Sequence, residues 1–184
     1  MRRILLAAVL MLLSSAAFAQ KMSVSMNLLG YAALGTMNAD VSYSVSRHWD
    51  VVAGARYNPF TFRAGDPDSQ FQMRQQSYAV GVRMWPWHTL SGWWFSSKVR
   101  YQEYNFGGIL SREAVEGDRF GLGVYAGYTH MLSRHLNLEF GLGVWGGADW
   151  YKRYSCTLCG LTLGSGRKAF VLPDDFAVSL VYVF

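Results

Sequence analysis

The most compact pair of reactive side chains in this chain is Cys156 and Cys159, in the order Cys-x-x-Cys. Such a pair can close a small disulfide ring, supply half of a zinc site or act as a redox couple. A zinc site needs about four ligands, and the neighbouring sequence supplies only these two thiols. A thioredoxin-type couple needs a helix N-terminus in its own fold, which this sequence does not indicate. We therefore predict a structural loop disulfide, with metal binding and redox chemistry as alternatives, and no cofactor.

Serine and histidine offer a second kind of chemistry, nucleophilic catalysis. The four histidines are His48, His88, His130 and His135, and Ser133 lies close to the last two. Barrel enzymes that deacylate lipids or cleave peptides gather Ser, His and a carboxylate at one rim. Turn residues of this composition are more often solvated, so we expect no catalytic residues and no enzyme.

A third set is a series of charged residues that alternate with apolar ones. Its members are Asp40, Asp50, Arg56, Arg83, Lys98, Arg100, Arg119, Glu139 and Asp149. The interior of an eight-stranded barrel is just wide enough for side chains. An unpaired charge there is costly, so we expect these residues to pair with one another and plug the lumen. A conducting channel is the alternative.

Eight segments with a period of two residues carry these side chains. They cover residues 22–31, 38–46, 49–57, 76–85, 93–106, 119–128, 136–150 and 175–184. In residues 119–128, for example, Phe120, Leu122 and Val124 share one face, and glycines share the other. The pattern predicts an all-β, eight-stranded antiparallel up-and-down transmembrane β-barrel. In a soluble barrel, the charged face would lie outside and the apolar face would fill the core.

The connections alternate in length. Ser46-Arg47-His48, residues 86–92 and Ser133-Arg134-His135 are short, whereas residues 58–75, 107–118 and 152–169 are long. Outer-membrane barrels have short periplasmic turns and longer extracellular loops. The chain has seven Trp, eleven Tyr and eleven Phe. The positions of these rings near both ends of the predicted strands indicate two interfacial belts.

Both termini agree with export to the outer membrane. Arg2 and Arg3 precede an apolar run and the site Ala17-Phe18-Ala19, which predicts a signal peptide over residues 1–19 and a barrel over residues 20–184. Its removal lowers the net charge from +5 to about +3, which argues against nucleic-acid binding. The last strand ends on Phe184, and a terminal aromatic resembles the signal that the barrel-assembly machinery reads.

Several stretches resemble a domain-of-unknown-function family of small outer-membrane barrels from Bacteroides-type bacteria. They are Asn27-Leu28-Leu29, SVSRHWDVVAGARYNPFTF at 44–62, YAVGVRMWP at 78–86, YNFGGI at 104–109, residues 151–160 with Cys-x-x-Cys-Gly, and the final SLVYVF. Lys21-Met22-Ser23 and Leu172-Pro173-Asp174-Asp175 depart from the family pattern, so the chain is identified as a divergent member. The resemblance implies an outer-membrane barrel, in some cases encoded near fimbrial genes, with no established catalytic residues.

These patterns favour a structural or adhesive role at the cell surface, carried by the long loops. The expected partners are outer-membrane lipid and lipopolysaccharide, the barrel-assembly machinery and a surface or fimbrial protein, and no nucleic acid. The alternatives are a membrane-embedded lipid-modifying enzyme and, third, a soluble periplasmic ligand-binding barrel. A lipid site would appear as a lateral gap or an outward cavity, and a soluble ligand-binding barrel would have an apolar lumen.

Overall fold

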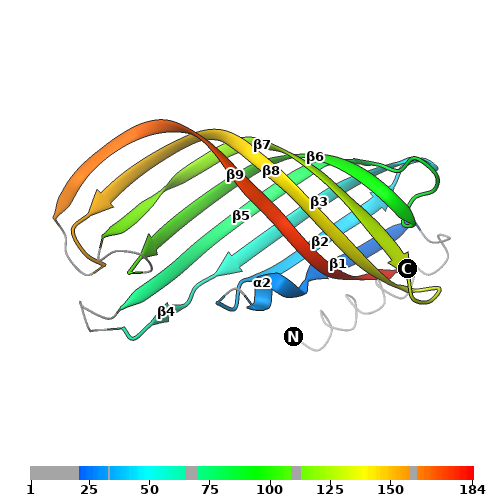
Figure 1. The fold of residues 1–184 in the computed structure, drawn as a ribbon, viewed down its shortest axis with the longest axis horizontal. Helices are drawn as coiled ribbons and strands as arrows, with labels where there is room; N and C mark the ends of the chain where they lie inside the picture. Colours follow the sequence, from blue (N-terminus) through cyan, green and yellow to red (C-terminus); the bar gives the residue numbers. More distant parts are fainter. Residues whose placement is uncertain (1–20, 33, 65–69, 109–112, 158–160) are drawn as a thin grey trace, which may run out of the picture.

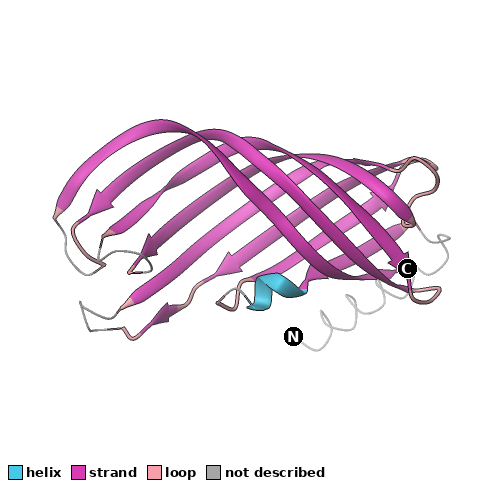
Figure 2. Cartoon of the chain, viewed as in Figure 1, coloured by secondary structure: helices cyan, strands magenta, loops and turns pink. Residues whose placement is uncertain are grey.

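The computed structural model describes the chain except residues 1–20, 33, 65–69, 109–112 and 158–160, together with the side chain of Asp175. Nine strands form one antiparallel sheet (Figures 1 and 2). β4 (Thr61–Phe62) only pairs with the end of β5. The other eight close into a barrel through pairings of β1 with β9 and β3 with β5. They are β1 (Met22–Asn27), β2 (Met37–Ser44), β3 (Trp49–Asn58), β5 (Phe71–Met84), β6 (Gly92–Gly107), β7 (Ala114–Met131), β8 (Leu136–Tyr154) and β9 (Thr162–Val183). The predicted eight-stranded antiparallel barrel is confirmed.

The strand bounds differ from the prediction most in the last strand. β9 begins at Thr162, not at residue 175, and its ladder with β8 continues to Tyr154. Most of the predicted long loop 152–169 is therefore strand, and β7 likewise begins at Ala114. Apolar alternation fails in these extensions because glycines and charged residues occupy them, although the backbone ladder continues. The prediction of long loops at 107–118 and 152–169 was wrong.

The first predicted strand is also shorter than expected. β1 ends at Asn27, and Leu28–Ala32 forms a short helix, α2. The Asn27 side chain accepts a hydrogen bond from the backbone N–H of Leu29 (3.0 Å), which is how asparagine starts a helix. Within the described chain, no helix is both long and apolar enough to cross a bilayer.

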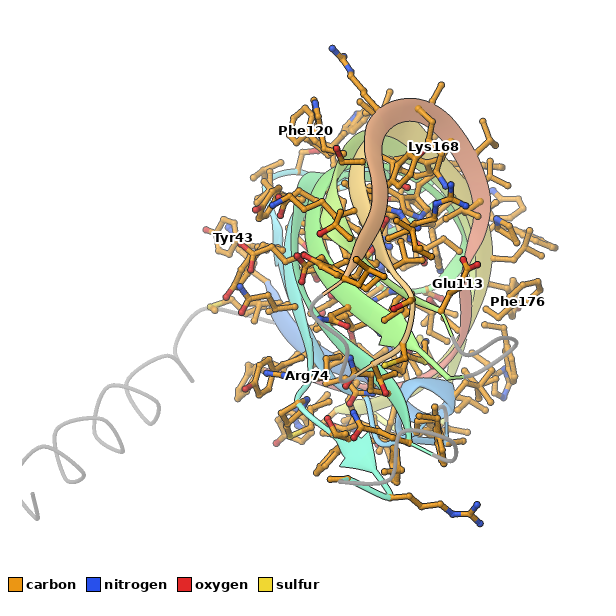
Figure 3. All side chains as sticks on the ribbon, turned by 90° about the vertical axis from the view of Figure 1, so that its left-hand side faces the viewer. Tyr43, Arg74, Glu113, Phe120, Lys168 and Phe176 are labelled. Carbon is orange, nitrogen blue, oxygen red and sulfur yellow. The ribbon has the colours of Figure 1, made fainter. Side chains whose placement is uncertain are left out.

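Strand length sets the shape of the barrel. It rises from 6 residues in β1 to 22 in β9, so β5 to β9 extend well beyond β1 to β3 (Figure 1). The end with the turns at 45–48, 85–91 and 132–135 is called the turn end below. The opposite end, with α2, β4 and the upper parts of β5 to β9, is called the projecting end; Figure 3 views the molecule from this side.

The two faces of the wall have opposite character. Apolar side chains point outward and stay exposed, as Figure 3 shows for Tyr43, Phe120 and Phe176. This apolar belt includes Val41, Val51, Val80, Val82, Val99, Phe120, Leu122, Val124, Phe140, Leu142 and Val144. Polar side chains point inward and are buried, among them Ser42, Asp50, Ser77, Arg83, Ser96, Lys98, Arg100, Thr129, Glu139, Asp149 and Ser179. This polarity is the reverse of that of a soluble protein.

Aromatic side chains lie near both ends of the apolar belt. At the turn end, Trp49, Trp87 and Trp93 are exposed, and the rings of Tyr182 and Phe184 make an edge contact at 5.0 Å. The backbone N–H of Phe184 donates to Met22, so the last residue remains part of the closed wall. Toward the projecting end, Tyr57, Phe60 and Trp150 are exposed.

Candidate functional site

The lumen near the turn end is closed by a group that we call the turn-end plug: Asp50, Arg83, Trp85, Trp94 and Glu139. Arg83 forms an ion pair with Glu139 (Nη1 to Oε2, 2.9 Å), and both side chains are buried. The indole N–H of Trp85 donates to Asp50 (2.8 Å), and the Arg83 guanidinium lies 4.3 Å from the centre of the Trp94 ring. Rings and ion pair therefore hold one another in place.

Glycines on the inner wall make room for these rings. A Cβ atom at Gly127 would overlap the Trp94 indole, and one at Gly141 would lie 3.0 Å from it. Gly143 is placed in the same way against the ring of Tyr125. Large side chains thus fill this part of the lumen to the wall.

Further along the lumen, two arginines share one carboxylate. Arg56 (3.1 Å) and Arg100 both form ion pairs with Asp174, and the Tyr125 hydroxyl donates to the same carboxylate (3.0 Å). We call Arg56, Arg100 and Asp174 the Asp174 cluster. Lys98 pairs instead with Asp40 (3.6 Å).

Asp174 was not predicted as a lumen residue. Strict alternation from Ser179, which is inward and buried, places Asp174 on the outer face. An irregularity in the ladder between Gly141 and Gly143 shifts the pairing, so that Asp174 lies opposite the inward Gly143. A bulge of this kind reverses the facing of the residues beyond it, and the signal that could have located it is Pro173, which sheets tolerate mainly at edges and bulges.

A second cluster, the Asp149 cluster, repeats the two-to-one arrangement. Arg119 Nε lies 3.3 Å and Lys168 Nζ lies 3.7 Å from the Asp149 carboxylate, which also accepts a hydrogen bond from Tyr104 (2.8 Å). Asp149 is 0% exposed, whereas the Lys168 side chain is 54% exposed. Lys168 was expected in a loop, and its place opposite Asp149 follows from the extension of β9.

The predicted charge network is therefore divided along the lumen. Of the nine predicted residues, the structure pairs Arg83 with Glu139, Lys98 with Asp40 and Arg119 with Asp149. Arg56 and Arg100 pair with Asp174 instead, and Asp50 accepts its hydrogen bond from Trp85. The turn-end plug and the Lys98 pair hold two cations and three carboxylates, whereas the Asp174 and Asp149 clusters hold four cations and two carboxylates. The lumen thus becomes more positive toward the projecting end.

A cavity of about 750 Å³ lies at the projecting end. Six of its lining residues form one continuous row of cross-strand partners, each joined to the next by the sheet register. In order, they are Asn58, Gln75, Tyr104, Gly117, Tyr151 and Gly166. The row lies on the inward face, and Gly117 and Gly166 leave it without side chains at two positions. We call this space the trough cavity.

The next inward row lies beside the trough cavity, one step closer to the turn end. On β7, β8 and β9 its members are Arg119, Asp149 and Lys168, and on β6 it is Gln102, which donates to Gln75 (2.5 Å). Tyr104 joins the two rows, because it lines the cavity and bonds to Asp149. The Asp149 cluster is therefore joined to the cavity through Tyr104, whereas the charged residues that line the cavity itself are Arg74, Glu103, Glu116, Asp118 and Lys152.

The wall of the trough cavity is incomplete on one side. Its described lining comes from β3 and from β5 to β9, and includes no residue of β1 or β2. β1 pairs with β9 only from Ser179 to Val183, so the described residues 162–175 of β9 pair with β8 alone. α2 packs against β9 below this opening, and residues 34–36, which follow it, bond to Asn58 of the cavity wall.

Side chains on the outer face of the projecting end form a polar layer, and its carboxylates Glu103, Glu116 and Asp118 also line the trough cavity. The hydroxyl of Tyr101 lies 2.9 Å from both Glu103 and Asp118. Nearby, Tyr154 donates a hydrogen bond to Glu116, and this bond raises the pKa of the Tyr154 hydroxyl. The layer marks where the apolar belt stops.

The predicted thiol pair and the histidines lie at opposite ends. Cys156 follows β8 at the projecting end and is buried, whereas Cys159 lies outside the described residues, so the disulfide stays a prediction. All four histidines lie in or beside the turns of the turn end, where His48 and His88 stack at 6.4 Å. Within the described residues, no group of three or more His, Cys, Asp or Glu could hold a metal ion.

Comparison with known proteins gives a family but no characterised relative. A family model with the description "Protein of unknown function (DUF3575)" matches residues 4–184. No curated protein matches the chain.

Proposed function

Because the chain belongs to the DUF3575 family of proteins of unknown function, we propose its role from the barrel itself: a non-conducting outer-membrane barrel that acts at the cell surface through its projecting end. A structural or adhesive role, with a surface or fimbrial protein as partner, is the form that we favour. The resemblance of the sequence to Bacteroides-type outer-membrane barrels supports the same assignment.

The apolar belt around a charged interior is the observation that carries this proposal. Along β7, the outward side chains from Phe120 to Tyr128 are all apolar, and all but Ala126 are large. That run is about the length that a tilted strand needs to cross a bilayer, about 9–11 residues. Exposed to water, a continuous apolar belt would drive aggregation, whereas hydrocarbon solvates it.

The orientation follows from the two ends. Short turns are typical of the periplasmic side, and the signal peptide predicted at residues 1–19 supports export. The projecting end, with its polar layer and the trough cavity, then faces the outside of the cell. Lipopolysaccharide and other outer-membrane lipid would surround the belt, and the barrel-assembly machinery would insert it.

The turn-end plug argues against a channel, because Trp85 and Trp94 are buried inside the lumen and the Arg83–Glu139 ion pair beside them is buried as well. The incomplete wall of the trough cavity is consistent with the alternative of a lipid-modifying enzyme. The histidines argue against this alternative, because all four lie at the turn end, away from the cavity. The cavity therefore supports binding better than catalysis.

Fractionation of cells tests the proposal. We expect the mature protein in the outer membrane, with a folded form that shifts on gels when heated, and negligible conductance in planar bilayers. Phe184→Asp should lower the amount of assembled protein, because it places a charge at the interface. Recovery of the wild type as a soluble periplasmic protein would overturn the proposal, and a large steady current would overturn its non-conducting part.

A further inference from the structure

We propose that the free edge of β9 at the projecting end binds an extended, acidic segment of another protein as an added strand. The proposal rests on the proposed function and deepens it, since it names the kind of partner and the part of the projecting end that holds it. Residues 162–172 of β9 are called the open edge below. An added strand there would close the side of the trough cavity that the barrel leaves incomplete.

The open edge carries backbone groups that lack a strand partner. β8 pairs with one side of it, and no described strand pairs with the other side, because β1 meets β9 only from Ser179 to Val183. Toward the turn end, the open edge stops at Pro173, which has no N–H. Beyond it, the Asn27 side chain bonds to the backbone C=O of Phe176 and N–H of Val178, both at 3.3 Å. A row of free N–H and C=O groups is a template for strand addition.

The trough cavity gives room to the side chains of an added strand. Side chains alternate along a strand, so every second residue of the added strand would point into the lumen. On that face of the open edge, a Cβ atom at Gly164 would have nothing within 4 Å, and one at Gly166 would lie 3.2 Å from the Tyr151 hydroxyl. Inward side chains of the segment can therefore reach the cavity, while backbone pairing supplies affinity.

The charge beside the open edge selects an acidic segment. Residues 150–154 and 162–172 contain no carboxylate and four cations: Lys152, Arg153, Arg167 and Lys168. The carboxylates of the cavity lining lie instead on β6 and β7, where the hydroxyls of Tyr101 and Tyr154 bond to them.

Two of these cations lie on the open edge itself. Arg167 and Lys168 are both exposed and point to opposite faces of the sheet, because they are consecutive residues of a strand. Lys168 shares its neighbour Asp149 with Arg119, so that carboxylate does not balance both cations. A carboxylate on either face of an added strand would meet one cation, and opposite charges on neighbouring strands stabilise their pairing.

A second copy of this chain fits the open edge poorly. Two identical edges related by a two-fold axis pair with each other in antiparallel orientation. In the proposed orientation, β9 runs from the outside toward the periplasm in every copy, so antiparallel pairing would require one of the two barrels to be inverted. Cations on an edge also discourage pairing with a like edge. The segment therefore comes from a different protein outside the cell.

Selection from a displayed library of random twelve-residue segments tests the proposal. The target is the folded full-length mature barrel in a zwitterionic detergent, and the selected segment is synthesised for a binding titration. We expect enriched segments to contain Asp or Glu within an alternating pattern. Arg167→Glu should weaken binding at least tenfold, the size expected for the loss of one charge-assisted contact. Gly166→Leu should also weaken it, because the new side chain occupies the space for inward residues of the segment.

The chain offers a matched control for the charge change. Arg134→Glu makes the same substitution at the turn end, far from the open edge, and should bind as the wild type does. The heat-induced gel shift shows which variants are folded.

Backbone methylation distinguishes strand addition from binding by side chains alone. One synthetic segment carries N-methyl groups on its odd-numbered residues and another on its even-numbered residues. In a strand, the N–H groups of alternate residues point to the same edge, so only one of the two sets would donate to β9. We expect one methylated segment to lose binding and the other to keep it.

Equal effects of the two methylation patterns would overturn the proposal, as would the absence of any enriched segment. Unchanged binding by folded Arg167→Glu or Gly166→Leu would also overturn it. A dimer of the barrel that the segment dissociates would identify a second copy as the natural occupant, and so contradict it. Because the experiment is performed in detergent, it does not depend on where the protein fractionates, and its failure is distinct from a failure of the proposed location.

Discussion

The two halves of the lumen are built from the same residue types but are packed differently. Near the turn end, Trp85 and Trp94 fill the space to the wall, and the Arg83–Glu139 pair is closed to water. Near the projecting end, a cavity of about 750 Å³ remains, and its charged lining residues are Arg74, Glu103, Glu116, Asp118 and Lys152.

This difference shows that a charged interior can fill one part of a lumen and leave another part open. In the turn half, nearly balanced charge and large rings stabilise the wall and block passage. In the projecting half, Gly117 and Gly166 in the lining row leave open space beside charged side chains of both signs. Strand length links the two, because among the described strands only β3 and β5 to β9 reach far enough to line the cavity.

We expect the largest loss of stability when the buried Arg83–Glu139 ion pair is broken. Glu139→Leu leaves Arg83 buried without its carboxylate, and should lower the free energy of unfolding by about 3–5 kcal/mol. Lys168→Gln in the projecting half should cost less than about 1 kcal/mol, because its partner keeps Arg119 and its own side chain is exposed. Denaturant titration in detergent measures both, and equal losses would show that the halves do not differ.

The next effect compares the outer surfaces of the two halves. Leu142→Arg should cost about 2–4 kcal/mol, because it places a charge in the middle of the apolar belt. Leu163→Arg, near the start of β9, should cost at most about 1 kcal/mol, because the proposed orientation places the projecting end in water. Unfolding in lipid vesicles gives the two values, and similar tolerance at both sites would place neither in the membrane.

A smaller effect tests packing inside the lumen. Gly143→Ala should destabilise by about 1–3 kcal/mol, because the new Cβ overlaps the Tyr125 ring. Gly164→Ala has open space around it and should stabilise by up to about 1 kcal/mol, since it reduces the freedom of the unfolded chain. Thermal unfolding followed by the gel shift reports the signs, and the same sign for both would contradict the contrast in packing.

The smallest effect concerns the predicted disulfide at the projecting end. Changing both Cys156 and Cys159 to Ser should leave the barrel assembled, because so short a ring removes little entropy from the unfolded chain. Thiol labelling of intact cells should reach these residues only after reduction. Failure of the double variant to insert, or stoichiometric zinc that needs both thiols, would contradict the structural role.

The sequence predicted the strands that cross the belt and missed what lies beyond it. The alternation of apolar and polar residues is strong where one face of a strand belongs to the apolar belt and the other faces the polar lumen, as in residues 119–128. It fades in residues 162–170, where both faces are polar or glycine, and there only the ladder with β8 maintains the strand. Asp174 was missed because the irregularity opposite Gly141 and Gly143 reverses its facing, and a local pattern carries no sign of that shift.

The sequence by itself determined the fold class, the number of wall strands and the facing of most belt residues, because the period of two is a local property of the backbone. The tertiary structure decided which charges meet. Arg56 and Asp174 are 118 residues apart, and only closure of a sheared barrel brings them within 3.1 Å. It also decided that the lumen has a filled half and a hollow half, because that depends on how far each strand extends past its neighbours.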